Sequence, residues 1–173
     1  MLTESASGKK LDSWISDDAL SRLYENFLRE YFKTHHPELH PGSRIIVWDR
    51  QPSANDVSLL PSMKSDVHLS TGASTLIIDA KYYSQTLQKS TFGKETIHSA
   101  NLYQIFTYVK NAARQTSGPV SGLLLYAKTD SPMQPYLDEV FGGNRIGVRT
   151  LDLSLPWCFL RHELEALTTW LDS

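Results

Sequence analysis

The chain has 173 residues, of which 40% are apolar and 21% are charged, and its 17 Lys and Arg against 19 Asp and Glu give a formal net charge of -2. This length and composition favour one globular domain and exclude a disordered or fibrous protein. The near-neutral charge excludes a nucleic-acid-binding surface over the whole molecule, so any such contact must come from a local patch.

Cysteine content and hydropathy indicate the compartment. Cys158 is the only cysteine, which excludes an internal disulfide, and we expect it to be packed near a C-terminal helix. The sequence has neither a signal peptide nor an apolar run of about 20 residues that could cross a bilayer. We therefore expect a cytoplasmic protein with a flexible segment at 1–14 and one folded domain at 15–173.

The first element in the chain is a predicted helix from Asp17 to about His35. Its apolar residues recur at the i, i+3, i+4, i+7 spacing of an amphipathic helix. Ser16 supplies an N-terminal cap, and Pro37 ends the helix.

Strands follow this helix. A short strand is predicted at 44–48, and two further strands at 63–70 and 74–81 predict a hairpin because a short glycine-containing turn joins them. Side chains alternate across a strand, so Asp66 and His68 share one face. His68 is either a hydrogen-bonded surface residue or a group that assists near Asp66.

The second half of the chain alternates helices with strands. We predict a long loop at 83–97, a helix at 101–113, a buried strand at 122–127, a strand at 145–153 and a last helix at 154–171. This order favours the α/β class, with a mixed central sheet flanked by helices.

Two carboxylates and one ammonium group are predicted to meet at the end of the hairpin. If its strands pair, Asp66 lies close to Asp79, and alternation places Lys81 on the same face as Asp79. Two close carboxylates raise one another's pKa unless a cation lies between them, so this group holds either a proton or a metal ion. Oxygen ligands select a hard ion, and we expect Mg²⁺, for which Mn²⁺ can substitute. A metal-bound water beside a lysine is suited to phosphodiester hydrolysis.

Three segments in the same order resemble a known group of nucleases. "LLPSMKSDVHLS", "TLIIDAKYYS" and "NLYQIFTYVKN" are similar to the C-terminal nuclease domain of the McrC family, within the PD-(D/E)xK superfamily. McrC proteins are the cleavage subunits of McrBC 5-methylcytosine restriction systems. The resemblance implies a restriction-endonuclease-like fold for residues 15–173 and a metal-dependent DNA endonuclease activity.

The resemblance also implies roles for the residues at the hairpin end. Asp66 and Asp79 would bind the metal ion, with the main-chain carbonyl of Ala80 as a further ligand. Lys81 would act on the attacking water. Without the resemblance, the alternative for Asp79 and Lys81 is an exposed ion pair at a strand end.

Two helical residues complete the set that the resemblance implies. Glu25, in "LYENF", matches the acidic residue that many members of the superfamily present near the metal. Gln104 matches a glutamine on the later helix, where Asn101, Gln104 and Tyr108 form a polar stripe. This stripe faces either the active site or, in the simpler interpretation, solvent.

The family pattern implies DNA as substrate and an McrB-like GTPase as the partner that recognises methylated cytosine. The large N-terminal portion that meets this GTPase is not part of the similarity, which begins at Arg22. The chain is then either an excised domain or a shortened relative. Two alternative functions remain open. The chain could be a nuclease-fold module that binds DNA or a partner without cleaving, or it could be a nuclease of the same chemistry that acts on branched DNA or RNA.

Other charged and metal-binding residues are weaker candidates. His35, His36 and His40 invite a zinc interpretation, which Pro37 disfavours because it breaks the helix that would bring them together. Five scattered cations could form a local basic patch, or they could belong to an ordinary solvated surface. These are Lys89, Lys94, Lys110, Arg114 and Lys128.

Overall fold

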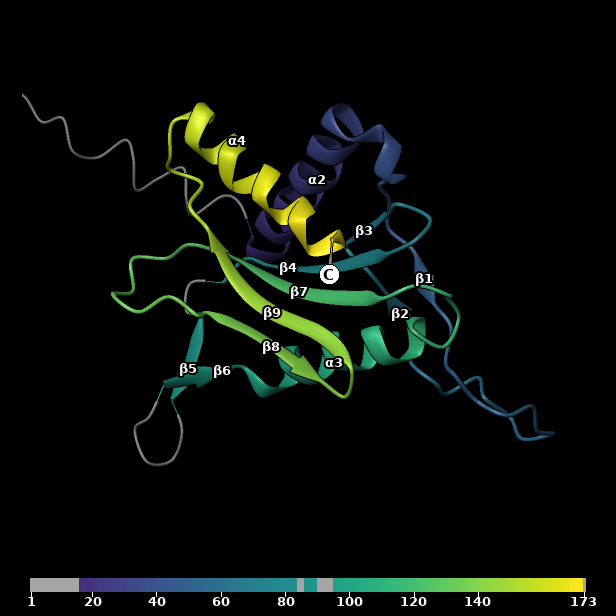
Figure 1. Cartoon of the computed structure of the whole chain (residues 1–173). Coiled ribbons are helices and arrows are strands. Elements are labelled where there is room, and N and C mark those ends of the chain that lie inside the picture. Colours follow the sequence, from purple (N-terminus) through teal and green to yellow (C-terminus); the bar gives the residue numbers. More distant parts are fainter. Residues whose placement is uncertain (1–15, 84–85, 90–94, 173) are drawn as a thin grey trace, which may run out of the picture.

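The computed structural model describes residues 16–83, 86–89 and 95–172. A five-stranded mixed sheet forms its centre, with α2 and α4 on one face and α3 on the other (Figure 1). The predicted class, a mixed central sheet flanked by helices, is confirmed. The predicted flexible segment at 1–14 lies outside the described residues, and the domain boundary at 15 stays a prediction.

The helices are α2 (Asp17–His35), α3 (Ser99–Ala112) and α4 (Trp157–Ala166), with 3₁₀ helices η1 (Pro37–Leu39) and η2 (Leu167–Leu171). The strands are β1 (Ile45–Ile46), β2 (Met63–Lys64), β3 (Val67–Ser70), β4 (Thr75–Lys81), β5 (Leu87–Lys89), β6 (Glu95–Ile97), β7 (Val120–Ala127), β8 (Leu137–Phe141) and β9 (Asn144–Leu151). None of the helices in these described ranges is long and apolar enough to span a membrane.

The order of strands in the central sheet is β3-β4-β7-β9-β8. β4, β7 and β9 run parallel, while the two edge strands β3 and β8 run antiparallel to their neighbours. Helices cover both faces, which explains why β4 and β7 are almost entirely buried and read as continuous apolar runs. A charged residue on β4 is therefore exceptional.

The predicted first helix is confirmed at both ends. The Ser16 hydroxyl accepts a hydrogen bond from the Ala19 main-chain N–H at 3.2 Å, which satisfies one of the free donors of the first turn. Leu28 and Phe32 on this helix are fully buried against the sheet.

The predicted hairpin forms, but its first strand is divided in two. β2 pairs with β1 and β3 pairs with β4, so Asp66 lies in the short connection between β2 and β3. The division has a local cause: the Ser65 N–H donates to the Arg44 carbonyl at 3.0 Å and the Arg44 N–H donates to the Ser65 hydroxyl at 3.1 Å. These bonds hold the chain to β1 up to Ser65, and only after Asp66 does it join the main sheet.

Several other predictions need correction. The predicted loop at 83–97 contains the antiparallel pair β5 and β6, and strand β8 was not predicted. The predicted last helix ends as an α-helix at Ala166 and continues as the 3₁₀ helix η2. Cys158 is exposed rather than packed, because the buried stripe of α4 is Leu160 and Leu164.

Candidate active site

Strand β4 carries two charged residues on the face that is covered by α3. Ile77 on this face packs with α3, whereas Ile78 and Ala80 on the other face pack with α2. Alternation therefore turns Asp79 and Lys81 toward α3. Asp79 is only 2% exposed, and the Lys81 Nζ lies 2.7 Å from the Asp79 Oδ2.

Asp66 reaches the same place from the neighbouring edge of the sheet. The β3–β4 ladder pairs Val67 with Ile78, which brings Asp66, one residue earlier, level with Asp79. The main-chain N–H of Ala80 extends past the end of this ladder and donates to the Asp66 Oδ2 at 2.8 Å. The carboxylate of Asp66 thus accepts the hydrogen bond that a main-chain carbonyl would accept if the ladder continued, and this bond fixes it beside Asp79.

The two carboxylates perturb one another. Burial, together with the nearby Asp66, raises the pKa of Asp79 to about 7 despite the opposing effect of Lys81. Burial also raises the pKa of Asp66, although the Ala80 N–H and Lys81 oppose it. Burial would lower the pKa of Lys81, but the Asp79 carboxylate outweighs it and keeps that pKa above its ordinary value. Lys81 is consequently an ammonium at neutral pH.

Helix α3 contributes the residue that holds Lys81 on its other side. The Lys81 Nζ donates to the Gln104 Oε1 at 3.1 Å, and the Gln104 Nε2 donates to the Tyr108 hydroxyl at 2.9 Å. Asn101, one turn earlier, donates to the Tyr126 hydroxyl on β7 at 2.8 Å. The polar stripe therefore faces the sheet and the site, and the interpretation as a solvated face is wrong.

Burial of this stripe decides which face of α3 meets the sheet. Asn101 and Tyr108 are buried, whereas the apolar Phe106 is 38% exposed. Hydrogen bonds between polar groups satisfy the buried face, so hydrophobicity alone did not identify it.

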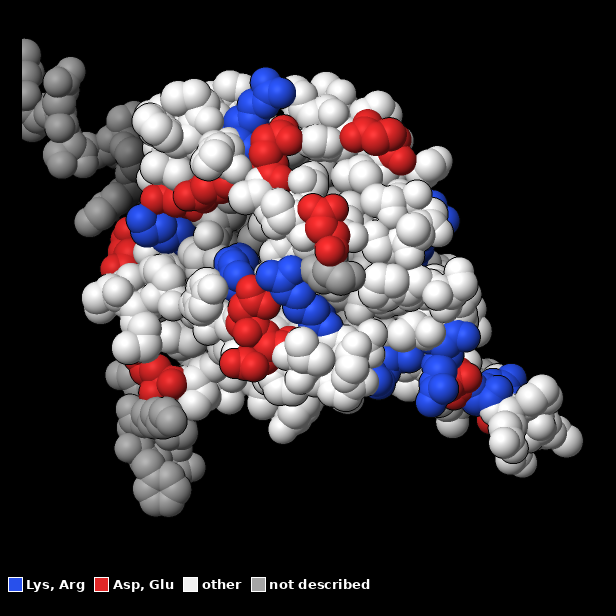
Figure 2. All heavy atoms as spheres, viewed as in Figure 1, with Lys and Arg blue, Asp and Glu red and all other residues white. Residues whose placement is uncertain are grey.

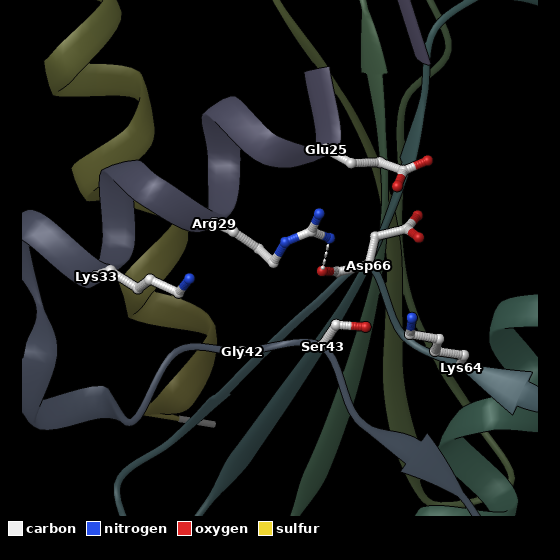
Figure 3. Close-up of a pocket in the computed structure, with 7 residues that line it drawn as sticks. All are labelled: Glu25, Arg29, Lys33, Gly42, Ser43, Lys64 and Asp66. Atoms are coloured by element: carbon white, nitrogen blue, oxygen red, sulfur yellow. Dashed lines mark hydrogen bonds between the residues drawn. The ribbon is translucent and has the colours of Figure 1, made fainter. Parts of the chain in front are cut away.

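Glu25 lies on α2, at the rim of a cavity of about 370 Å³ that it shares with Asp66. Figure 3 shows the carboxylates of Glu25 and Asp66 at the same end of this cavity. Burial and the nearby Asp66 raise the pKa of Glu25, while Arg29 and Lys81 oppose the shift. The structure therefore brings together all five predicted catalytic residues, Asp66, Asp79, Lys81, Glu25 and Gln104.

The donor atoms at this site fit a hard cation with few protein ligands. Mg²⁺ is commonly held by one or two carboxylates, with water or phosphate oxygens completing its octahedron. Asp66 and Asp79 supply two crowded carboxylates of raised pKa, which a cation between them would relieve. No group of three or more His, Cys, Asp or Glu side chains within the described ranges is placed to hold a metal ion, so Glu25 does not complete a three-carboxylate cluster.

The histidines considered for zinc do not form a metal site. His36 is the C-cap of α2, and its ring nitrogens contact Glu38 at 3.1 Å and Glu165 at 2.7 Å. His68 lies on β3, where burial and the nearby Arg44 lower the pKa of its imidazole to about 4.

Of the five cations proposed for a basic patch, the three whose side chains are described are each engaged by other groups of the protein. Lys110 donates to the Gly142 carbonyl and the Asn144 side chain, Arg114 pairs with Asp49, and Lys128 pairs with Asp152. Lys94 and the side chain of Lys89 lie outside the described part of the chain. Figure 2 shows basic and acidic side chains side by side over the face viewed there, in keeping with the small net charge.

Sequence reasoning missed the cations that do line the cavity beside Asp66. They are Arg29, Lys33 and Lys64 (Figure 3). A signal existed, because Glu25, Arg29 and Lys33 recur every four residues and must share one face of α2.

The chain has a restriction-endonuclease-like fold. This fold is defined by the mixed sheet with helices on both faces and by the acid pair and lysine at the end of its hairpin. The chain belongs to the family described as McrBC 5-methylcytosine restriction system component, whose model matches residues 19–127. The McrC-type resemblance found in the sequence is thereby confirmed.

A curated relative supports the same assignment. The type IV methyl-directed restriction enzyme EcoKMcrBC of Escherichia coli (strain K12) is 29% identical over 150 residues. The aligned region is 86% of this chain but only 42% of the relative, so the chain spans less than half of that protein's length.

Proposed function

We propose that this chain is the DNA-cleaving part of a McrBC-type restriction system and that it hydrolyses phosphodiester bonds in a Mg²⁺-dependent reaction. The observation that carries the proposal is the pairing of the almost fully buried Asp79 with Asp66 and Lys81 at the end of β4. Placing two carboxylates side by side, with Asp79 almost fully buried, costs folding free energy, so a function at this position is the better explanation.

Each residue has a part in the proposed reaction. Asp66 and Asp79 would hold the cation, with the main-chain carbonyl of Ala80 as a further ligand. When bound, Mg²⁺ would supply stabilisation of charge on the phosphate and an acidified water. Lys81 is held as an ammonium by Asp79, so we assign it to donate a hydrogen bond to the attacking water or to a phosphate oxygen rather than to remove a proton.

Gln104 and Glu25 assist from the two helices. Gln104 accepts from Lys81 and so fixes the direction of its ammonium group. Glu25 lies at the same end of the cavity as Asp66, where it would bind water of the ion's outer coordination. Neither residue is required to contact the ion directly.

Substrate choice and partner are proposed from the relative. EcoKMcrBC is named as a methyl-directed enzyme, and we propose that this chain also cuts DNA in a methylation-dependent system. We assign methylcytosine recognition to an McrB-like GTPase partner, because the acid pair and Lys81 suit a metal ion and phosphate oxygens.

The first experiment is a plasmid nicking assay with the chain alone and with an McrB-like GTPase and GTP. Supercoiled DNA, methylated or unmethylated, is incubated with Mg²⁺, Mn²⁺ or EDTA. We expect nicking that needs the divalent ion, is lost in Asp79→Asn, and is retained in the surface control Arg161→Gln. Equal products from the wild type and Asp79→Asn under every condition would leave a nuclease fold that binds without cleaving.

A further inference from the structure

The cavity beside the acid pair continues as a groove along α2. Its lining is formed by seven residues, and we call it the α2 groove (Figure 3): Glu25, Arg29, Lys33, Gly42, Ser43, Lys64 and Asp66. The carboxylates of Glu25 and Asp66 lie at one end, while three cations line the rest. A ligand in this groove would meet positive charge along its length and the proposed cation site at its end.

Two separate parts of the chain form the walls. Glu25, Arg29 and Lys33 stand on successive turns of α2. The opposite wall is formed by Ser43, which precedes β1, and by Lys64 of β2, and the β1–β2 pairing holds these two segments together. The groove is therefore a product of the division of the predicted hairpin strand, which places β2 outside the main sheet.

The positive charge of the groove is only partly neutralised by the protein, because Arg29 acts on the carboxylates of Glu25 and Asp66 at one end while Lys33 and Lys64 lie farther along. The Arg29 guanidinium donates to the main-chain carbonyl of Asp66 at 2.8 Å and to the Asn26 side-chain oxygen, both of which are uncharged. Lys33 pairs with Glu30 at 2.7 Å, but both side chains are about half exposed or more, and such pairs contribute little. In the described ranges, no carboxylate lies within ion-pair distance of Lys64.

We propose that the α2 groove binds the phosphodiester backbone of the DNA strand next to the phosphate being cleaved, with Arg29, Lys33 and Lys64 contacting its phosphates. This inference rests on the proposed function, because it uses the acid pair as the place of cleavage. From Glu25 to Lys33 the helix rises about 12 Å. A DNA strand rises roughly 3.4 Å per nucleotide, so the groove spans about three nucleotides.

A larger hollow among the described residues does not suit a polyanion. It measures about 1140 Å³ and lies beyond the ends of β4 and β7. Its lining includes Asp17, Asp18 and Asp130, and the one Lys or Arg among its described lining residues, Lys128, is paired with Asp152 at 2.6 Å. Phosphates would be repelled there, so the α2 groove is the better path for the strand.

Phosphate contacts of this kind carry no sequence information. The groove would fix the position and direction of the strand in any sequence. This matches a cleavage module whose choice of site is made elsewhere.

Binding is measured apart from cleavage. Fluorescence anisotropy of a labelled DNA duplex is recorded in EDTA over a range of salt concentrations, with the full chain and with the double variant Lys33→Gln, Lys64→Gln. Each phosphate contact contributes about 0.9 to the slope of log affinity against log salt for duplex DNA. We expect the double variant to lower the magnitude of this slope by roughly 1.8. Single-stranded DNA and duplex RNA serve as further probes.

Arg161→Gln is the matched control, because Arg161 on α4 is outside the groove and its side chain is 52% exposed. Its slope should equal that of the wild type, and thermal unfolding should show all variants folded. An unchanged slope in the double variant, an equal change in Arg161→Gln, or no DNA binding by the wild type would overturn the groove proposal. A wild type that binds through the groove but never nicks would overturn the proposed nuclease function alone.

Discussion

Lys81 joins strand β4 to helix α3, since its ammonium lies 2.7 Å from the Asp79 Oδ2 and donates to the Gln104 Oε1 at 3.1 Å. A flexible side chain with four rotatable bonds is thereby fixed from two directions. Tyr108 extends the fixation, because its hydroxyl accepts from the Gln104 amide at 2.9 Å. The position of the proposed catalytic ammonium therefore depends on a helix that does not itself carry a carboxylate of the site.

Replacement of Gln104 tests this dependence. Gln104→Leu keeps the bulk of the side chain but removes the acceptor for Lys81, so we expect cleavage to slow roughly 10- to 100-fold, the usual effect of losing an orienting partner. Single-turnover nicking separates the rate of the chemical step from binding. The rate should fall while affinity for DNA in EDTA stays unchanged.

Tyr108→Phe provides the graded control. It leaves Gln104 in place but removes the hydroxyl that holds its amide. We expect a smaller loss than in Gln104→Leu. A larger loss in Tyr108→Phe would show that the hydroxyl itself has a direct part in the reaction.

The raised pKa of Asp79 predicts a cost in stability without metal. The folded-state pKa of about 7 lies above the ordinary 3.8, so the folded protein binds a proton more tightly than the unfolded chain. Ionisation of Asp79 does not reduce the free energy of unfolding below about pH 4. The reduction grows as the pH rises to 7 and reaches its full size above pH 7. In EDTA, the free energy of unfolding of the wild type should fall relative to Asp79→Asn by a few kcal/mol between pH 4 and 8. Urea titrations at each pH measure this difference.

Metal addition supplies the control for this prediction. At pH 8, Mg²⁺ should raise the melting temperature of the wild type, because it binds the folded carboxylate pair, and should have a smaller effect on Asp79→Asn. Parallel pH profiles of the two proteins in EDTA would contradict the assignment of the cost to Asp79.

Sequence alone predicted the parts of the site that depend on local pairing. Asp66, Asp79 and Lys81 follow from one hairpin register and from alternation along β4. These relations need only neighbouring elements, so a short stretch of sequence specifies them. Glu25 was implied by the family resemblance rather than by local spacing, and it lines the same cavity as Asp66.

Relations between distant elements could not be predicted. The wall formed by Ser43 and Lys64 depends on the pairing of two-residue strands, which have no periodicity to detect. Strand β8 is an edge strand with a mostly exposed and irregular pattern. The buried face of α3 could not be chosen from the sequence because it includes Asn101 and Tyr108, whose burial depends on hydrogen-bond partners elsewhere.

His68 predicts a loss of stability in acid that is independent of the active site. Its folded pKa of about 4 lies below the ordinary 6.5 because burial and Arg44 disfavour the imidazolium. The contribution of neutral His68 to the free energy of unfolding is fully present above pH 6.5 and is lost as the pH falls from 6.5 to 4. His68→Gln should reduce the decrease in melting temperature over this range. The exposed His162→Gln should not, and equal profiles for His68→Gln and the wild type would contradict the prediction.

Gly122 on β7 controls how closely α3 approaches the sheet. A Cβ at this position would lie 2.5 Å from the Val109 Cγ2 and 2.9 Å from the Ile105 Cγ1, so Gly122→Ala must push the helix outward. We expect a loss of about 1–3 kcal/mol in the free energy of unfolding. Ile105 follows Gln104 directly, so the same shift should lengthen the contact between Gln104 and Lys81 and slow nicking. Gly42→Ala is the matched control for the unfolding measurement alone, since a Cβ there meets no atom within 4 Å but Gly42 lines the α2 groove. A Gly122→Ala protein of lower stability but full nicking rate would show that Lys81 keeps its position without the close packing of α3.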